Sequence, residues 1–337
     1  MFCMGRIEIK YFTSDGHDEA WQACHALDIA IAGRRGAQPD SLTWEDMRAK
    51  QSKADAGRDP QPHALIIENG VAALRIHTTR VSPGSESLQR WLVFDLLDEE
   101  PSEGIRQAFK QELASRLDPT RTSVIRTRVD ESRQANLLKA VRARVYNRYL
   151  YFKLPRTKLD GDWLTSHIDR IASANPEIRL EYCQFIPEEW LEEFARVYTI
   201  FLSNMEGVDD AAIDIVTPEG LRNREAKPGE VLTQYHVIAF HGEKLIGHSN
   251  VWMDTRQHET LHQFMTGVLA EYHGREIGFW MKCALYRWLL EAVPDFGNIH
   301  TDTIEANKRM QRLNARFGFE QTNTGYGFEI TREELLP

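Results

Sequence analysis

The chain has 337 residues, 42% of them hydrophobic and 27% charged, with a formal net charge of −9. This composition is typical of a globular protein of about two domains. The acidic balance disfavours a general nucleic-acid binder, which needs a basic surface. No apolar run reaches the ~18 residues of a membrane span, and the first residues lack the apolar core of a signal peptide. We therefore expect a cytoplasmic protein that binds neither nucleic acid nor a membrane.

The cysteines lie far apart and form no CxxC pair. No pair of histidines stands near them in a zinc-binding spacing. Reduced thiols, with no metal framework and no disulfide, are the expectation for Cys3, Cys24, Cys183 and Cys283.

Hydrophobic periodicity predicts ten elements in the first half of the chain. Asn69-Gly70, between two apolar runs, is a strong hairpin signal. The predicted order is a strand at 6–12, a helix at 17–31, a helix from about 43, strands at 64–67, 72–78 and 91–97, a helix at 104–117, a strand at 123–129, a helix at 132–146 and a strand at 149–154.

The same order of elements is predicted again after a polar, partly helical connector. It contains a strand at 178–185, helices at 187–202 and 217–225, strands at 231–240, 244–253 and 261–269, a helix at 275–292, a strand at 298–303, a helix at 306–317 and a final strand or hairpin at 319–330. A repeat of roughly 170 residues indicates two similar domains and not a solenoid. We expect domains at 1–156 and 177–337, joined by a connector at 157–176.

The stretch Leu261–Trp280 is predicted to be a strand, a turn with Gly274 and Gly278, and the start of a helix. Free backbone N–H groups and the helix dipole make such a helix N-terminus a site for an anion. Glycines let the backbone approach phosphate oxygens closely.

Three features of the C-terminal half resemble the GNAT superfamily of acetyl-CoA-dependent N-acetyltransferases. The turn His273-Gly274-Arg275-Glu276-Ile277-Gly278 is similar to the phosphate loop of that family. The strand that ends in Thr301-Asp302-Thr303 is followed by Asn307, and Phe317-Gly318-Phe319 is similar to the family's Leu-Gly-Phe ending.

The resemblance covers 178–330 by motif and 6–154 by element order alone. The doubled form resembles the tandem-GNAT branch, which includes mycothiol-synthase-like enzymes. It implies an α/β fold (an α+β mixed sheet) of two tandem GNAT-like domains, each a mostly antiparallel twisted sheet flanked by helices.

The resemblance also implies a cofactor site for acetyl-CoA as co-substrate, with no metal. The pantetheine arm would pair with the strand like an added strand, and the pyrophosphate would lie at the helix N-terminus. Asn307 would bind the pantetheine, cap its own helix, or do both. The implied cofactor-binding residues are Thr266, Gly267, Val268, His273, Gly274, Arg275, Glu276, Ile277, Gly278, Phe279 and Asn307.

The motif departs from the family at three positions. His273 replaces a basic or amide residue, and Glu276 replaces a small residue beside the expected pyrophosphate. Asn314 stands where many family members have a tyrosine that protonates the leaving thiolate. Because an amide cannot supply that proton, the general acid is unassigned.

Attack on a thioester requires that the amine lose a proton, so a group with a pKa near neutrality is needed. His262 occupies the strand position where several family members have a catalytic glutamate, and Glu259 is a second candidate. The alternative for His262 is a partly buried histidine that is bonded to a neighbour.

In the N-terminal half, the equivalent of the phosphate loop is Leu97–Gly104, with four carboxylates and a proline. Each repulsion with a pyrophosphate is on the order of 2–3 kcal/mol at a dielectric near 20. We predict that this half does not bind acetyl-CoA.

The resulting hypothesis is an N-acetyltransferase that transfers acetyl from acetyl-CoA to a primary amine of a small molecule, by direct attack in a ternary complex. The acidic segment Met205–Asp210 is either a receptor for a cationic amine or a solvated loop. The alternatives are a silent acyl-CoA-binding sensor or interaction module, and an acyltransferase for a longer acyl-CoA. The sequence predicts a monomer or a homodimer without deciding between them.

Overall fold

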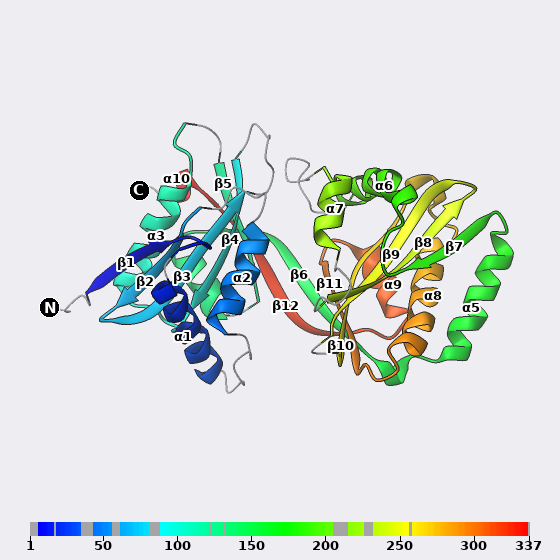
Figure 1. The fold of residues 1–337 in the computed structure, drawn as a ribbon, viewed down its shortest axis with the longest axis horizontal. Helices are drawn as coiled ribbons and strands as arrows, with labels where there is room; N and C mark the ends of the chain where they lie inside the picture. The colour runs from blue at the N-terminus through cyan, green and yellow to red at the C-terminus, as the bar shows by residue number, and fades with distance from the viewer. Residues whose placement is uncertain are drawn as a thin grey trace. The chain divides into compact units, whose positions relative to one another are not determined.

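The computed structural model describes residues 6–16, 18–34, 43–55, 61–80, 88–120, 123–130, 132–204, 215–225, 232–255 and 258–335. The acidic segment Met205–Asp210 lies outside these residues. The chain divides into two compact units (Figure 1). The first unit is Met1–Arg148 together with Gly325–Pro337, and the second unit is Tyr149–Thr324.

The sheet of the first unit has the strand order β1-β2-β3-β4-β5-β12. Its neighbours are antiparallel except for the parallel pair β4 and β5. The strands are β1 (Ile7–Phe12), β2 (His63–Glu68), β3 (Val71–Arg80), β4 (Leu88–Leu96), β5 (Ser123–Val129) and the last part of β12 (Glu320–Thr331). The helices are α1 (Asp18–Arg34), α2 (Trp44–Asp55), α3 (Glu103–Arg116), α4 (Ser132–Ala140) and α10 (Arg332–Leu335).

The sheet of the second unit has the strand order β6-β11-β10-β9-β8-β7, in which only β10 and β11 are parallel. The strands are the last part of β6 (Arg144–Pro155), β7 (Ile178–Cys183), β8 (Leu232–His241), β9 (Lys244–Asp254), β10 (Thr260–Val268) and β11 (Asn298–Ile304). The helices are α5 (Gly161–Ala174), α6 (Leu191–Ser203), α7 (Pro218–Arg224), α8 (Ile277–Ala292) and α9 (Lys308–Ala315).

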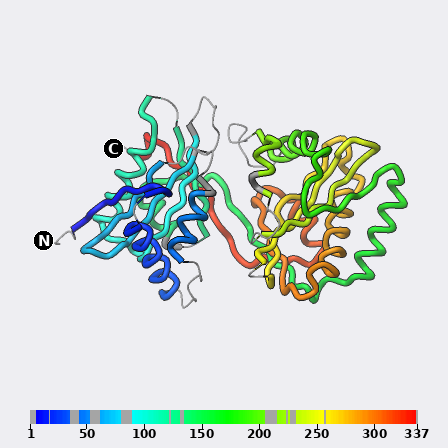
Figure 2. The backbone as a smooth tube through the Cα atoms, in the orientation of Figure 1, coloured from blue at the N-terminus to red at the C-terminus, as the bar shows by residue number. Residues whose placement is uncertain are grey.

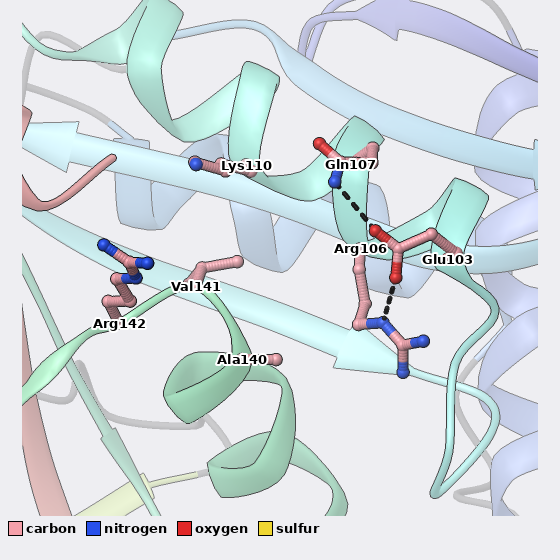
Figure 3. A pocket seen from close by; sticks show the side chains of 7 residues that line it. All are labelled: Glu103, Arg106, Gln107, Lys110, Ala140, Val141 and Arg142. Carbon is pink, nitrogen blue, oxygen red and sulfur yellow. Dashed lines mark hydrogen bonds and ion pairs between the residues drawn. The ribbon is translucent and has the colours of Figure 1, made fainter. Parts of the chain in front are cut away.

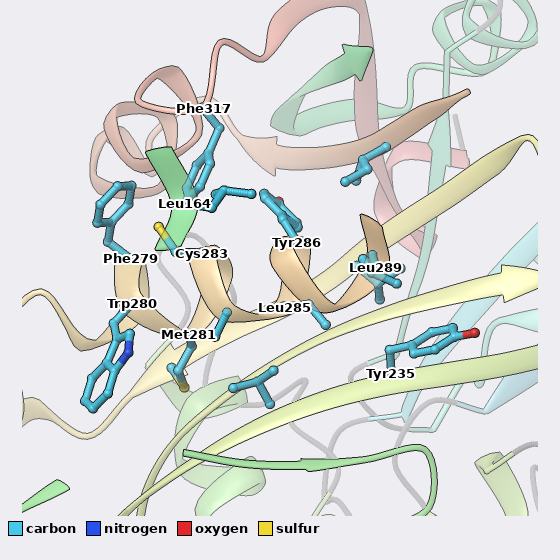
Figure 4. Close-up of a cluster of buried hydrophobic side chains, with 14 of the residues drawn as sticks. Leu164, Tyr235, Phe279, Trp280, Met281, Cys283, Leu285, Tyr286, Leu289 and Phe317 are labelled. Atoms are coloured by element: carbon cyan, nitrogen blue, oxygen red, sulfur yellow. The ribbon is translucent and has the colours of Figure 1, made fainter. Parts of the chain in front are cut away.

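Helix α8 is the central element of the second unit. Ten of its residues are buried, as expected for a helix that is enclosed by the protein on most sides. On one side it packs on β8 and β9, and on the other it contacts α5. Figure 4 shows this core, with Tyr286 pointing from α8 towards Phe317. We call the side of the sheet that α8 covers the α8 face, and the opposite side, which α6 covers, the α6 face.

The predicted fold class and the repeated order of elements are confirmed. The Asn-Gly turn is also confirmed, because Asn69 and Gly70 both have positive φ, at 52° and 83°. Several predicted boundaries differ from the observed ones by a few residues, and the largest error is at the end of the fourth helix. The helix predicted at 132–146 ends at Ala140, since Arg142 has a φ of 65° and β6 begins two residues later.

The connector predicted at 157–176 is mostly one helix, α5. Asp160 caps its N-terminus by accepting from the backbone N–H groups of Asp162 and Trp163. Leu164 and Ile171 are buried in the core beside α8. A segment that is partly polar in sequence therefore forms part of the second unit.

The grouping of strands differs from chain order at the end of each repeat. Tyr326–Thr331 of β12 pairs with β5 in the first unit, and Tyr149–Pro155 of β6 pairs with β11 in the second. The predicted division at 1–156, 157–176 and 177–337 follows chain order, which contains no information on the sheet that a terminal strand joins. None of the described helices combines the length and the hydropathy that crossing a lipid bilayer requires.

Candidate functional site

The second unit contains a point where two parallel strands diverge. β10 and β11 pair at only three positions, the last of which joins His262 to His300. Beyond it β10 stays paired with β9 as far as Val268, and β11 stays paired with β6 as far as Ile304. The facing edges of β10 and β11 are therefore not paired with each other past His262, and their backbone groups can pair with an inserted ligand.

Buried polar side chains shape β10 at this point. Relative to β9, β10 has one extra residue between Gln263 and Thr266, and such a bulge bends a strand. Asn250 accepts a hydrogen bond from the backbone N–H of Met265 at 3.1 Å. The Gln263 amide donates to the carbonyls of Asn250 at 2.8 Å and Met265 at 3.0 Å. These bonds fix the bulge.

The loop after β10 ends at an uncapped helix (yellow to orange in Figure 2). Glu276 is the N-cap residue of α8, with a left-handed backbone (φ 59°) and no capping bond from its side chain. The first intrahelical bond runs from Trp280 N–H to the Glu276 carbonyl at 2.9 Å. The N–H groups of Ile277, Gly278 and Phe279 therefore have no partner within the helix. This is the arrangement that binds anions.

Gly278 brings the start of α8 close to the end of β10. A Cβ atom there would lie 3.6 Å from a Val268 methyl and 3.7 Å from a Thr266 methyl. Gly267, on β10, faces the other way, because a Cβ atom there would lie 2.5 Å from the Phe201 ring of α6. The predicted pantetheine residues thus lie on a strand that α8 covers on one face and α6 covers on the other.

The carboxylate of Glu276 is held by two arginines. Arg170 and Arg316 each approach it at 2.8 Å. The hydrogen bond from Arg170 is the largest cause that lowers the pKa of Glu276. The two arginines reduce the repulsion that was expected between this carboxylate and a phosphate, because they neutralise its charge.

The other two polar residues of the loop have partners. Arg275 donates to Asn175 at 2.9 Å and forms an ion pair with Glu177, so its charge is directed to the corner between α5 and β7. His273 receives a bond from Arg309 at Nδ1, at 2.9 Å. Because arginine only donates, Nε2 carries the proton and donates to the Val268 carbonyl at 2.9 Å.

Asn307 caps α9, with its side-chain oxygen accepting from Met310 N–H at 2.9 Å. The predicted cap is present. A bond from Asn307 to the pantetheine stays a prediction.

On the α6 face, aromatic side chains cross three strands at the divergence point. The ring of His262 stacks on Trp252 with centroids 4.0 Å apart, and lies 6.0 Å from the ring of His300. Burial, then the charge of His300, lowers the pKa of His262. Burial, then Lys153, lowers the pKa of His300. Both rings are therefore neutral at pH 7, the form that accepts a proton.

Sequence reasoning did not identify His300. Alternation places it on one face of β11, but only the parallel pairing with β10 brings it to His262. Glu259 differs from both histidines in its exposure and in its position along the strand. It is exposed and precedes β10, and its backbone carbonyl accepts from Gly297 and Asn298 at 2.8 and 3.0 Å. It therefore lies at the end of β10 that is remote from the loop.

In the equivalent region of the first unit, side chains of the protein itself bond to the helix N-terminus, to a loop carboxylate and to a strand carbonyl. Ser102 caps α3 by accepting from Ile105 N–H at 3.1 Å. Asp98 forms an ion pair with Arg34. Pairing of β4 with β5 ends at Trp91, but Gln134 donates to the Phe94 carbonyl at 2.7 Å. The capped helix contrasts with the uncapped start of α8.

The first unit also has a cavity of about 290 Å³ beside α3 and the end of α4 (Figure 3). The carboxylate in it, Glu103, is bonded to Arg106 at 3.0 Å and to Gln107 at 2.7 Å. The lining residues are Glu103, Arg106, Gln107, Lys110, Ala140, Val141 and Arg142. In the part of the chain that the structure describes, no three His, Cys, Asp or Glu side chains are grouped to hold a metal ion.

No protein-family model and no curated protein matches the chain, but solved structures do. A tandem GNAT protein from the clavulanic acid biosynthesis pathway matches with a TM-score of 0.70 and 16% identity, over 97% of this chain and 99% of that one. A GCN5-related N-acetyltransferase from Sphaerobacter thermophilus matches with a TM-score of 0.61 and 12% identity, over 97% and 96%. A glucosamine N-acetyltransferase region of a fungal multi-domain β-N-acetylglucosaminidase matches at 0.64 and 13%, over 96% and 38%. The chain therefore has the tandem GNAT fold, as the resemblance in the sequence predicted.

Proposed function

We propose that the protein is an N-acetyltransferase whose second unit binds acetyl-CoA between β10 and β11. The observation that carries this proposal is the divergence of these strands beside an uncapped helix N-terminus. The free edge of β10 suits the amide groups of a pantetheine arm. The N–H groups at the start of α8 suit a pyrophosphate.

In this proposal the residues of β10 and those of the loop bind different parts of acetyl-CoA. Thr266, Gly267 and Val268 bind the pantetheine, and the backbone from Gly274 to Phe279 faces the pyrophosphate. The paired carboxylate of Glu276 supports a loop that tolerates a phosphate nearby. Asn307 lies at the start of the helix after β11, where its amide nitrogen is a donor for the same arm.

The chemistry proposed is direct attack of a primary amine of a small molecule on the thioester. His262 takes the proton of the amine, since a lowered pKa keeps its ring neutral at pH 7. The position of His262 where β10 and β11 part supports this role. The exposed Glu259 is the weaker candidate for the same step.

Calorimetric titration with acetyl-CoA tests the binding site. We expect one acetyl-CoA per chain and an affinity at least about tenfold lower for Gly278→Asp, because one carboxylate at a helix N-terminus opposes a bound anion. Gly278 has room for a Cβ atom. Gly33→Asp is the matched control, since it adds the same charge at a position with no atom within 4 Å.

Thiol release with a panel of primary amines then tests the reaction, and acetyl-, propionyl- and succinyl-CoA are compared as donors. Absence of acetyl-CoA binding would refute the proposal. Binding without turnover on any amine would favour the silent sensor. Two acetyl-CoA per chain would refute the prediction that the first unit binds none.

A further inference from the structure

A lysine is fully buried in the second unit next to an amide. Lys282 of α8 has 0% of its surface exposed and Asn314 of α9 has 1%. The Lys282 ammonium donates to the side-chain oxygen of Asn314 at 2.7 Å. The rings of Tyr286, Phe317 and Phe319 surround it, with centroids 5.6, 5.8 and 5.3 Å from Nζ. Fully buried lysines are rare unless a carboxylate pairs with them, and no described carboxylate pairs with this one.

Among the described residues, none beside Lys282 supplies a compensating charge. Its titratable neighbours on α8 are Cys283 and Tyr286, and burial raises the pKa of Cys283 to about 12 and also raises that of Tyr286. Both are therefore neutral at pH 7. Asn314, Phe317 and Phe319, which approach from α9 and from the segment after it, have no charge. Burial lowers the pKa of Lys282 to about 7, so Lys282 can exchange a proton near neutral pH.

The helical spacing shows which part of the sheet Lys282 faces. Gly278, Lys282 and Tyr286 are one turn apart and form one stripe of α8. The first of them lies against Thr266 and Val268, and the last donates to Gln263 at 3.0 Å. Lys282 therefore lies along the part of β10 that has diverged from β11. Asn314 reaches it from the helix that follows β11.

Asn314 has an unused hydrogen-bond donor at this place. Its Nδ2 atom is buried and has no hydrogen-bond partner in the part of the chain that the structure describes. A buried donor without a partner destabilises the folded protein unless a ligand or water accepts from it. A thiolate sulfur is such an acceptor. Asn314 is also the residue that replaces the family's proton-donating tyrosine, and an amide cannot give up a proton.

We propose that Lys282 supplies the proton to the leaving sulfur, and that Asn314 positions both groups. This inference rests on the proposed function. The amine nitrogen bonds to the acetyl carbon and its proton passes to His262. The carbon–sulfur bond breaks with its electron pair on sulfur, and the sulfur takes a proton from Lys282 Nζ, which solvent later restores. A thiolate beside the ammonium stabilises the charged form of Lys282. The two groups therefore share this proton, and the ammonium lowers the pKa of the thiol.

Coenzyme A itself is the probe, because it requires no knowledge of the acceptor amine. Conversion of the thiol of protein-bound coenzyme A to the thiolate raises the absorbance in the far ultraviolet, and this change is titrated around the free thiol pKa of about 8.5. We expect the bound thiol to have a pKa at least about one unit higher in Lys282→Met than in the natural protein, a tenfold change in the thiolate fraction. Lys158→Met is the matched control, because Lys158 is a surface residue paired with Glu320.

Lys282→Gln is the second variant. It retains a donor for Asn314 but no charge, so it separates loss of the ammonium from loss of packing if Lys282→Met unfolds. The same raised thiol pKa in Lys282→Gln supports the proposal. Coenzyme A that binds to all three proteins with one unchanged thiol pKa overturns it. Failure of the natural protein to bind coenzyme A refutes the proposed function instead, so the two failures are distinguishable.

Discussion

His262 and His300 are coupled through their positions on neighbouring strands. The charge of His300 contributes to the lowered pKa of His262. A base with a lowered pKa remains neutral, and active, until the pH falls through that pKa. The maximal rate is therefore expected to decrease as the pH falls below this value.

His262→Ala is expected to lower the maximal rate of acetyl transfer at least about 100-fold, the lower end of the range for general base catalysis, with little change in the affinity for acetyl-CoA. His300→Gln removes a ring that becomes positively charged as the pH falls. It should raise the pKa of His262 and move the acid limb of the pH–rate profile to higher pH. An unchanged rate in His262→Ala, or an unmoved limb in His300→Gln, contradicts this assignment.

At this scale the sequence predicts residues that act through their own backbone or their own helix. The cap by Asn307 is an example. His300 and Lys282 could not be predicted, because each meets its partner across two elements that are distant in sequence. Spacing alone does not distinguish Lys282 from an exposed helical lysine.

Strand β10 and helix α6 approach each other so closely that only glycine fits at 267. Rotation of a flexible side chain cannot make room for a Cβ atom at this position, since the atoms that it would meet belong to the rigid ring of Phe201. The contact fixes the distance between β10 and α6. It therefore also fixes the position of the β10 edge that faces β11.

Gly267→Ala is expected to destabilise the protein by about 1–3 kcal/mol, the usual cost of overpacking, and to weaken acetyl-CoA binding. Urea unfolding and calorimetry measure the two effects. Gly33→Ala, at an open position near the end of α1, is the control that should not destabilise. Wild-type stability of Gly267→Ala would show that α6 moves freely and that the contact is unimportant.

At the scale of elements the sequence was informative, because periodicity and turn residues are local. The order of strands and helices follows from them in both repeats. The packing of α5 against α8 does not, since a helix with a polar outer face is compatible with a solvated connector. The pairing of β10 with β11, which defines the site, is likewise a long-range property.

Each unit contains a pair of buried histidines, and together they affect the stability of the whole molecule. The rings of His63 and His77 stack with centroids 4.0 Å apart. The Nδ1 atom of His236 lies 2.9 Å from the Nε2 atom of His248, at hydrogen-bond distance. Burial lowers the pKa of His63 to about 2 and those of His77 and His236 to about 4. It also lowers the pKa of His248.

Because these groups bind protons more readily when the chain is unfolded, stability is highest above the unfolded pKa of 6.5 and decreases as the pH falls below it. Each histidine contributes a slope of about 1.4 kcal/mol per pH unit in that range. Denaturant unfolding from neutral to mildly acidic pH measures the slope. His63→Phe should reduce it and the exposed His258→Gln should not. An equal slope in all three proteins rejects this explanation.

Because the last strand of each repeat pairs in the sheet of the other unit, the two units complete their sheets at different times during synthesis. β5 is made long before Tyr326–Thr331, the segment that pairs with its open edge. The residues between them take roughly 10–40 s to translate at ~5–20 residues per second. During that time β5 presents unpaired N–H and C=O groups, which can pair with any other extended chain. The first unit to leave the ribosome is thus the last to close, and the nascent chain is exposed to mispairing until the second unit has been translated.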